Sequence, residues 1–271
     1  MFSVLLSVYK KEHPTYLKQS LDSLFAQTLP PDEIVLVKDG PLTPELEAVV
    51  TEYQSRYPML KVVPLPQNQG LGKALNEGLK HCSYELVARM DTDDIAKPER
   101  FERQMQVFRE HPETDVCSAW IEEFYNDTNH VVAVKKLPER HEEIRAYARK
   151  RCPVNHPAAM FRKSKVLKAG GYPPIPQYED YGLWVRMLMN GCRFYNLQES
   201  LLYFRTTPDT FRRRGGWKYV VKEIGLQKEM YRIGFISAPT FCLNVLIRLV
   251  VRLMPNGIRG FIYKSLLRKK K

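Results

Sequence analysis

The sequence predicts an α/β protein, built on a doubly wound and mostly parallel β-sheet and followed by an amphipathic helical tail. Short apolar runs alternate with helical patterns over the first 111 residues, which is the rhythm of βαβ units. Acidic and glycine residues directly follow several apolar runs, as they do at the strand ends of open α/β sheets. The excess of lysine and arginine lies wholly after residue 204. These three observations divide the chain into a main domain, residues 1–205, and a tail, residues 206–271.

The first half of the main domain contains four expected strands, each followed by an expected helix. The strands are short apolar runs rich in strand-forming residues, at residues 2–9, 33–38, 60–65 and 84–91. The helices lie at residues 13–26, 44–56, 72–81 and 98–111, and Pro98 suits the first position of the last one. Because right-handed crossovers join successive parallel strands, the carboxyl ends of all four meet at one edge of the sheet.

The second half of the main domain is less regular. We expect a strand at 116–124, an edge strand at 131–136, a charged helix at 139–150, a short apolar run at 158–161, and two closing strands at 193–197 and 201–205. Residues 181–190 (YGLWVRMLMN) predict a strongly apolar helix that ends at Gly191. Trp184 lies in the apolar stripe of this helix, so we expect it in the core rather than beneath a sugar.

The composition is that of a globular protein whose charge is unevenly distributed. The formal net charge is +12, and residues 205–271 contribute 16 Lys/Arg against 3 Asp/Glu, whereas residues 1–204 are nearly neutral. The five cysteines are scattered without a CxxC pair, which indicates neither a zinc site nor a disulfide framework and fits a reducing compartment. The N-terminal MFSVLLSVYKK has no basic residue before its apolar run, so we expect a first strand rather than a signal peptide.

The tail combines apolar and basic residues in a pattern typical of helices that lie on a membrane surface. Residues 239–255 are apolar except for Asn244, Arg248 and Arg252, which are spaced four apart and so line one face of a helix. The run is short and charged for a bilayer span, and we expect it in the interface with its arginines at the lipid headgroups. We expect the whole segment 239–271, which ends in RKKK, to bind an anionic membrane surface; the alternative is a helix packed on the core with a solvated basic end.

A second basic stretch precedes the apolar part of the tail. Arg212–Arg214 are followed by two glycines and then by Trp217 and Tyr219. This stretch can either close over a diphosphate or bind the pyrophosphate of a lipid acceptor, and the alternative is a solvated loop.

Three carboxylates directly follow the fourth strand, in the segment MDTDD. Asp91, Asp93 and Asp94 repel one another there, and a hard divalent cation such as Mn²⁺ or Mg²⁺ would relieve the repulsion. The plain alternative is an acidic turn ahead of Pro98. A calcium EF-hand is excluded, because Ala96 occupies the position at which that loop needs glycine.

Polar and glycine-rich segments follow the other strands of the first half. Asp39 lies in KDG after the second strand, and NQGLGKALN (residues 68–76) joins the third strand to its helix. Backbone N–H groups and helix N-termini at such an edge suit a nucleoside diphosphate. The segment is not a dinucleotide fingerprint, since Leu75 replaces the third glycine, and it is not a P-loop, since Ala74 follows Lys73.

Six segments together resemble a known enzyme family. They are SVYKKE near the start, KDG, NQGLGKALNEGL, MDTDD, NHPAAMFRKS and YEDYGLW, and they occur in this order over about residues 2–205. In this combination the chain resembles the family 2 glycosyltransferases of GT-A fold, inverting enzymes of bacterial polysaccharide assembly. The resemblance implies a nucleotide-binding half at about residues 1–97 and an acceptor half at residues 98–205.

The resemblance also assigns residues to the donor, the metal and the reaction. It places Tyr9, Glu12, Asp39 and Asp91 at the nucleotide sugar. The polar strand ends add the expected donor residues Ser7, Asn68, Gly70, Lys73, Asn76 and Thr92, and we expect His156 to face the donor or the acceptor. Asp91 and Asp93 are expected to hold Mn²⁺ or Mg²⁺ on the diphosphate. The base is expected from an ED pair before a helix, here Asp180, with Glu179 to orient it or to bind acceptor hydroxyls; the alternative is that either carboxylate caps the helix. For His156 the alternative is a structural histidine in a turn.

The predicted function is the metal-dependent, inverting transfer of a sugar from a nucleotide-sugar donor, with UDP implied by the resemblance. The expected acceptor is a polyprenyl-pyrophosphate-linked saccharide of O-antigen, capsule or exopolysaccharide synthesis, at the cytoplasmic face of a bacterial inner membrane. One rival is a sugar-phosphate nucleotidyltransferase, which needs a glycine-rich loop after the first strand, where this chain has YKKE. A second rival is nucleic-acid binding by the tail. Its basic residues are interleaved with Leu, Val and Ile more than with stacking aromatics, so we expect no nucleic-acid partner.

Overall fold

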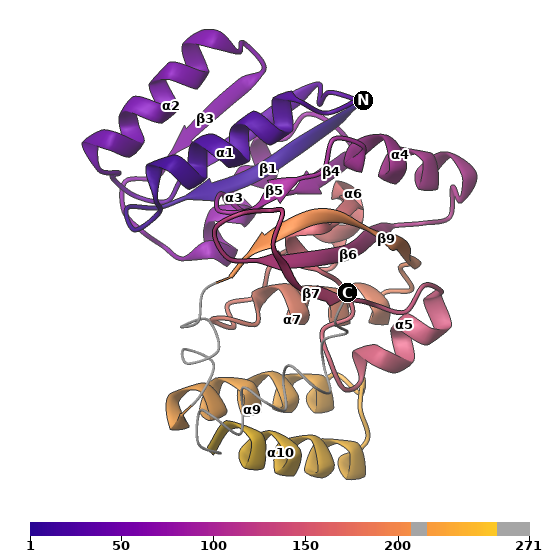
Figure 1. Cartoon of the computed structure of the whole chain (residues 1–271). Coiled ribbons are helices and arrows are strands. Elements are labelled where there is room, and N and C mark those ends of the chain that lie inside the picture. Colours follow the sequence, from indigo (N-terminus) through magenta and orange to yellow (C-terminus); the bar gives the residue numbers. More distant parts are fainter. Residues whose placement is uncertain (207–215, 254–271) are drawn as a thin grey trace.

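The computed structural model describes residues 1–206 and 216–253, which build a mixed β-sheet with helices on both faces (Figure 1). Its first half consists of β1 (Phe2–Val8), α1 (Pro14–Phe25), β2 (Glu33–Lys38), α2 (Pro44–Arg56), β3 (Leu60–Pro64), α3 (Leu71–His81), β4 (Leu86–Arg89) and α4 (Arg100–Glu110). β3, β2, β1 and β4 pair in parallel in that spatial order. The strands and helices expected in this half are therefore confirmed, and the sheet is doubly wound around β1. The expectation that Pro98 takes the first position of the last helix is wrong, because α4 begins at Arg100 with Glu99 as its N-cap.

The second half of the sheet mixes parallel and antiparallel pairs. It consists of β5 (Ile95–Ala96), β6 (Val116–Phe124), β7 (Val131–Lys135), α5 (His141–Ala148), η1 (His156–Ala158), β8 (Met160–Arg162), α6 (Lys163–Lys168), α7 (Glu179–Met189) and β9 (Phe194–Arg205). β8 pairs antiparallel with both β4 and β6, so it joins this half to the parallel half. The sequence patterns do not reveal β5 or α6, which are too short to show a period.

The two closing strands expected at residues 193–197 and 201–205 are one strand, so that prediction is wrong. β9 pairs in parallel with β6 from Phe194 to Arg205, with two register shifts along the way. Gln198 and Glu199 interrupt the apolar pattern. They have no partner on β6, because Ala119 pairs with Leu197 and the next residue, Trp120, pairs with Ser200. A β-bulge of this kind bends a strand without ending it.

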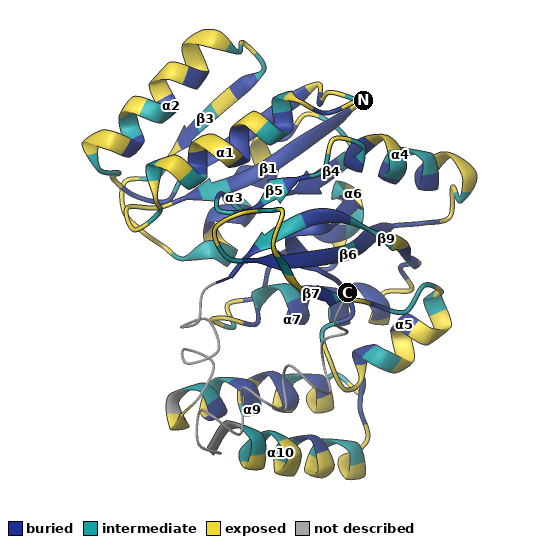
Figure 2. Ribbon diagram, in the orientation of Figure 1, coloured by how far each residue is buried: buried dark blue, intermediate teal, exposed yellow. Residues whose placement is uncertain are grey.

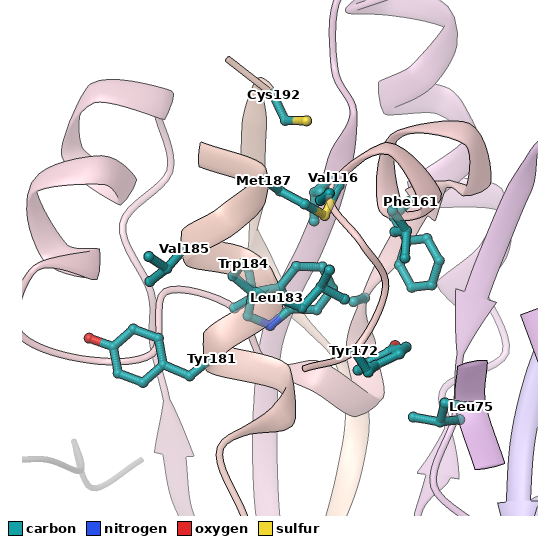
Figure 3. Close-up of a cluster of buried hydrophobic side chains, with 14 of the residues drawn as sticks. Leu75, Val116, Phe161, Tyr172, Tyr181, Leu183, Trp184, Val185, Met187 and Cys192 are labelled. Carbon is teal, nitrogen blue, oxygen red and sulfur yellow. The ribbon is translucent and has the colours of Figure 1, made fainter. Parts of the chain in front are cut away.

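Buried apolar side chains form a core on each face of the sheet. One core contains residues of α1, α2 and α4, and the other contains residues of α3, α5, α6, α7 and the tail. Figure 3 shows the second core, in which Trp184 of α7 is fully buried near Val116 and Met187, so its expected core position is confirmed. Burying a large apolar side chain stabilises a fold by about 1.5–3 kcal/mol. This packing fixes α7 and therefore the two carboxylates of its first turn.

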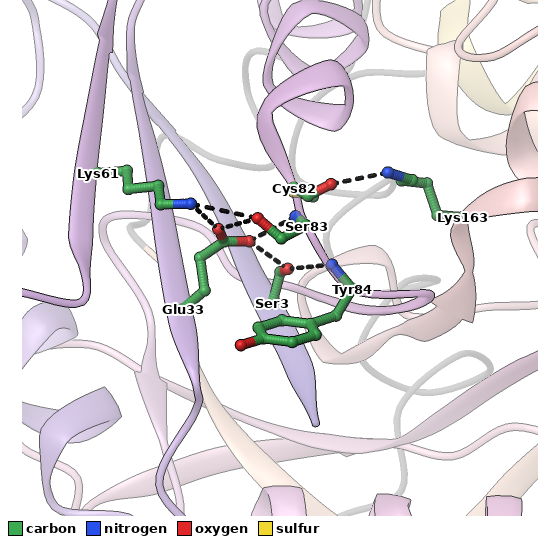
Figure 4. A network of polar contacts seen from close by, with 7 residues as sticks. All are labelled: Ser3, Glu33, Lys61, Cys82, Ser83, Tyr84 and Lys163. Atoms are coloured by element: carbon green, nitrogen blue, oxygen red, sulfur yellow. Dashed lines mark hydrogen bonds and ion pairs between the residues drawn. The ribbon is translucent and has the colours of Figure 1, made fainter.

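A polar network lies at the amino ends of the parallel strands (Figure 4). The buried Glu33 carboxylate accepts hydrogen bonds from Ser3 Oγ, from Ser83 N at 2.8 Å and from Ser83 Oγ at 2.7 Å, and it pairs with Lys61 Nζ. Burial alone raises the pKa of Glu33, but these contacts outweigh it and lower the pKa to about 2. The network ties β1, β2, β3 and the segment before β4 together at the edge opposite to the acidic segment.

The tail forms a layer of two helices, α9 (Trp217–Arg232) and α10 (Ala238–Leu253), with α9 in contact with both α7 and α10 (Figure 1). Asn244 of α10 is buried, and its Nδ2 donates to the Arg149 carbonyl oxygen and to Gln227 Oε1, both at 2.9 Å. Arg248 Nε donates to Glu223 Oε1 at 2.9 Å. The expectation that Arg248 points outward to lipid headgroups is therefore wrong, because the polar face of α10 packs on the protein.

The opposite face of α10 is apolar and exposed (Figure 2). Leu243, Leu246, Ile247 and Val250, at the spacing of one helix face, are 49–60% exposed. Across residues 1–206 and 216–253, no helix has the length and apolarity to cross a membrane. Arg212–Arg214 and residues 258–271, for which the sequence also predicts anion or membrane contacts, lie outside the described residues.

Candidate active site

The acidic segment Asp91–Asp94 follows β4, beside the carboxyl end of β1. β1 lies between β2 and β4, so the chain winds away from it in both directions. In open α/β sheets, ligands bind in the crevice that such a switch point opens. The structure therefore places the predicted donor segments at the edge where the fold class binds ligands.

Two arginines hold the acidic segment in one conformation. The fully buried Arg89 guanidinium forms an ion pair with Asp91. Arg205, at the end of β9, donates from its backbone N–H to Asp94 Oδ1 and from Nε to the Asp93 carbonyl oxygen, each at 2.8 Å. The segment is thus shaped by the protein itself before any ligand binds.

Burial and neighbouring carboxylates raise the pKa of two aspartates of this segment, Asp93 and Asp94. Burial, followed by the charges of Asp91 and Glu12, raises the pKa of Asp93 to about 7. Burial and the charges of Asp93 and Asp91 raise the pKa of Asp94 well above its ordinary value, and Asp94 Oδ2 is buried without a hydrogen-bond partner among the described residues. A cation at Asp91 and Asp93 would remove this repulsion.

The residues of the segment fit a metal that is shared with a ligand. No group of three His, Cys, Asp or Glu side chains that could hold a metal occurs in the described ranges. Mg²⁺ at nucleotide sites is nevertheless bound through one or two carboxylates, with phosphate and water oxygens completing its shell. Asp91 and Asp93 can supply those carboxylates.

The loop after β1 is joined to the acidic segment through Glu12. Thr92 Oγ1 donates to Glu12 Oε2 at 2.8 Å and lies 3.5 Å from the Ser7 carbonyl oxygen. Tyr9 is 43% exposed, which leaves its ring accessible to a planar group such as a nucleobase. Four of the predicted donor residues therefore lie together here.

Asp39 shapes the glycine-rich loop. Its carboxylate accepts hydrogen bonds from Gln69 N at 2.7 Å, Gly70 N at 3.1 Å and Asn68 Nδ2 at 2.9 Å. Gly40 has φ +86°, and a Cβ there would approach Asn68 N to 2.6 Å, so the close contact requires glycine. The contacts of Asp39, Asn68 and Gly70 with a nucleotide stay predictions.

Lys73 and Asn76, both on α3, have different surroundings. Lys73 is exposed and forms no ion pair with the described residues, so its charge is available to a phosphate. Asn76 Nδ2 donates to the Tyr172 carbonyl oxygen at 2.9 Å, and Asn76 Oδ1 accepts from Tyr172 N at 2.8 Å. The Asn76 amide thus joins α3 to the segment before α7, and its predicted role at the donor is not the contact that the structure shows.

Glu179 and Asp180 form the first turn of α7. The N-cap of this helix is Tyr178, so neither carboxylate occupies the capping position. Burial raises the pKa of both carboxyl groups. Glu179 Oε2 is buried without a hydrogen-bond partner in the described ranges, and Cys152 Sγ lies 3.7 Å from Asp180 Oδ2. A partly desolvated carboxylate of raised pKa is a suitable general base.

His156 is buried and neutral. Its Nε2 lies 3.0 Å from the Tyr172 hydroxyl, and its ring packs edge-on against Trp184. Burial, and then the charge of Arg89, lowers the pKa of His156 well below its ordinary value. These surroundings favour the structural alternative, and a donor contact of His156 stays a prediction.

The buried Tyr172 hydroxyl is influenced by charges of both the acidic segment and the pair on α7. Burial raises the pKa of its hydroxyl, Arg89 lowers it, and the charges of Asp180, Asp91 and Glu179 raise it further. A Cβ on Gly72, in the first turn of α3, would lie 3.2 Å from Glu179 Cβ. The charges of Asp91, Glu179 and Asp180 thus act on one buried hydroxyl, and the first turn of α7 packs against the first turn of α3.

Residues 3–171 match the family model described as glycosyl transferase family 2. The chain belongs to this family. It is 40% identical over 268 residues (99% of this chain, 97% of the relative) to the UDP-Gal:alpha-D-GlcNAc-diphosphoundecaprenol beta-1,3-galactosyltransferase of Escherichia coli. It is 43% identical over 268 residues (98% of each chain) to the amylovoran biosynthesis glycosyltransferase AmsE of Erwinia amylovora. Its fold is similar to that of S. aureus TarS 1–349 in complex with UDP-GlcNAc (TM-score 0.67, 20% identity, 92% of this chain and 71% of that chain).

The predicted glycosyltransferase class and GT-A fold are therefore confirmed. Sequence reasoning missed three residues of the site of this family 2 enzyme: Arg89, Arg205 and Tyr172. Arg89 had a visible signal, since it is a charged residue inside an otherwise apolar strand. Arg205 and Tyr172 had none, because only the tertiary fold brings them to the acidic segment and to α7.

Proposed function

We propose that this glycosyltransferase transfers a sugar, with inversion, from a UDP-sugar to a hydroxyl of a saccharide carried on a polyprenyl diphosphate. The observation that carries the proposal is the packing of the first turn of α7, which carries Glu179 and Asp180, against Gly72 in the first turn of α3, so that both carboxylates lie beside the glycine-rich loop. The name of the E. coli relative gives a UDP-Gal donor and a diphosphoundecaprenol-linked GlcNAc acceptor, and the two chains match over nearly their whole length. The Erwinia relative acts in amylovoran biosynthesis, which supports a role in bacterial polysaccharide assembly.

The donor occupies the edge of β1, β2 and β4 in this proposal. Asp91 and Asp93 would hold Mn²⁺ or Mg²⁺, and the bound cation would stabilise the charge on the departing nucleoside diphosphate. Arg89 and Arg205 keep the acidic segment in position. Tyr9 and the loop shaped by Asp39 contact the nucleoside.

Asp180 acts as the general base. It accepts the proton of the acceptor hydroxyl while that oxygen attacks the anomeric carbon from the face opposite to the nucleotide. Burial raises the pKa of Asp180, which strengthens it as a base. Glu179, with one buried oxygen that lacks a partner among the described residues, accepts a hydrogen bond from the acceptor.

The enzyme acts at the cytoplasmic face of the bacterial inner membrane, as a peripheral protein. The exposed apolar face of α10 would lie in the lipid interface, while its polar face is used by contacts with α9. The sequence that follows α10 adds Arg259, Lys264 and a final RKKK, which suit anionic headgroups. A lipid-borne acceptor requires such a location.

Calorimetric titration tests the donor site. UDP, GDP and dTDP are titrated into the full-length protein with Mn²⁺ and again with EDTA, and we expect UDP to bind only when the metal is present. Asp93→Ala should weaken UDP binding at least about tenfold, a loss of ~1.4 kcal/mol. Glu110→Gln, at an exposed carboxylate on α4, serves as the control. Equal affinity for the three nucleotides, or UDP affinity unaffected by Asp93→Ala, would contradict the assignment.

A further inference from the structure

A groove separates α9 from the segment that leads into α7. It has a volume of about 380 Å³. One wall is apolar and consists of Pro174, Ile175 and Pro176, and the other carries the charged side chains of Arg186, Lys222, Glu229 and Arg232. The residues assigned above to the donor, the metal and the base do not line it.

The groove is basic, and one carboxylate holds two of its three cations. The Glu229 carboxylate accepts hydrogen bonds from Arg186 Nη2 at 3.1 Å and from Arg232 Nε at 2.9 Å, and these contacts lower the pKa of Glu229. Lys222, two turns earlier on the same face of α9, is half-buried and forms no hydrogen bond or ion pair with the described residues. Three cations thus line the groove with a single carboxylate.

The apolar wall of the groove continues directly into the proposed base. Residues 174–176 precede Glu179 and Asp180 by a few positions, and Gln177 between them has φ +72°, a strained conformation for a residue other than glycine. A Cβ on Gly182 would lie 2.7 Å from Pro173 Cγ, so this segment packs tightly on α7. The Tyr178 ring also contacts the Tyr219 ring of α9, with centroids 5.8 Å apart. A ligand in the groove therefore touches the segment that positions Asp180.

We propose that this groove binds the diphosphate of the lipid-linked acceptor, an inference that rests on the proposed function. Guanidinium groups bind phosphate oxygens through paired N–H donors, and the Lys222 ammonium adds a point charge. The Pro174–Pro176 wall contacts the first apolar carbons of the lipid. The saccharide then extends toward Asp180, and the lipid toward the membrane.

The position of α9 supports a lipid diphosphate over a free one. One face of α9 lines the groove through Lys222 and Glu229, and the neighbouring face contacts α10 through Glu223 and Gln227. α10 in turn exposes the apolar face assigned to the membrane. The groove thus lies one helix away from the lipid surface, and the net positive charge suits a group that carries two phosphates.

Direct binding tests the groove. Geranyl diphosphate, a short prenyl diphosphate, is titrated into the full-length protein with UDP and Mn²⁺ at saturation, so that the donor site is occupied. We expect Lys222→Glu and Arg232→Ala each to weaken binding about tenfold or more. Lys228→Glu, which makes the same charge change at an exposed position of the same helix, should bind like the wild type. Thermal denaturation verifies the fold, and Lys222→Met replaces Lys222→Glu if that variant unfolds.

Three outcomes would overturn the groove assignment. They are the absence of geranyl diphosphate binding to a protein that binds UDP, an equal loss in Lys228→Glu, and inorganic diphosphate binding as tightly as geranyl diphosphate, which would indicate a free-phosphate site. Groove-dependent geranyl diphosphate binding in a protein that binds no UDP would instead overturn the proposed donor and leave the groove in place. In transfer assays, Lys222→Glu should raise KM about tenfold for a prenyl-diphosphate-linked GlcNAc, with kcat unchanged and with no effect on an alkyl GlcNAc acceptor.

Discussion

Among single residues, the proposed base Asp180 gives the most direct prediction for the reaction. We expect Asp180→Asn to lower kcat by about 10²- to 10⁴-fold, because an amide cannot accept the acceptor proton. Donor binding should persist, since Asp180 belongs to α7 and not to the acidic segment. Steady-state transfer assays and UDP titration, with Glu110→Gln as the matched carboxylate control, separate the two effects. Normal turnover of Asp180→Asn would place the base elsewhere.

The pH dependence of transfer gives a second test of the proposed role of Asp180 as the base. Burial raises the pKa of Asp180 above that of an ordinary aspartate. The base must be ionised to act, so wild-type kcat should fall as the pH decreases through this raised value, earlier than for an exposed carboxylate. The residual activity of Asp180→Asn should lack this acidic limb.

The arginines around the acidic segment show that ion-pair partners cannot be predicted from the sequence alone. The positions of Asp91 and Asp93 after a strand, and of Glu179 and Asp180 at a helix start, were predictable because they are local patterns. That Arg89 would be fully buried and paired with Asp91 depends on strands and loops from distant parts of the chain. A charged residue inside a buried strand therefore indicates that it needs a partner of opposite charge, but the sequence does not reveal which residue that partner is.

At the scale of elements, the parallel half followed from the sequence because each strand and helix has a clear period and a clear end. β9 did not, because Gln198 and Glu199 break its alternation, and only pairing with β6 allows the bulge that keeps it one strand. β5 and α6 are set by their partners rather than by their own residues. The periodicity of the sequence therefore predicts the long helices and strands, whereas the short ones depend on tertiary contacts.

The amino-end network of Glu33 gives a stability prediction for these strands. Glu33→Gln should lower the free energy of unfolding by about 1–3 kcal/mol at neutral pH, because it leaves buried donors without their carboxylate. The folded-state pKa of about 2 lies below the ordinary 4.5, so this stabilisation is complete above about pH 4.5 and is lost as the pH falls toward 2.

Urea denaturation at a series of pH values measures this difference. The control is Glu52→Gln, whose exposed carboxylate lies 3.6 Å from Lys18 Nζ and should contribute little. A difference between wild type and Glu33→Gln that persisted unchanged to pH 2 would show that the charge of Glu33 is not what the network stabilises.

For the whole molecule, the tail shows why amphipathicity alone does not give orientation. The spacing of Asn244 and Arg248 correctly predicts one polar face, but a polar face can turn toward water or toward partners. Here Gln227 and Glu223 of α9 supply those partners, so the apolar face is left outside. The segment is thus recognisable as a surface helix from sequence, and its outward side is known only from the fold.

The exposed apolar face of α10 gives a prediction for the whole molecule, namely membrane binding. We expect the full-length protein to sediment with vesicles that contain phosphatidylglycerol, and Leu243→Glu/Leu246→Glu to reduce the bound fraction at least about tenfold, because charged side chains replace leucines that would enter the interface. Leu167→Glu on α6, at a leucine of similar exposure (51%), is the matched control and should bind vesicles normally. Transfer to a soluble acceptor should be unchanged in both variants.

Vesicle binding that survives the double substitution would move membrane attachment away from α10. Loss of a dimer in place of loss of vesicle binding would show that this face binds a second copy of the chain, and a preference for oligonucleotides over vesicles would overturn the membrane assignment.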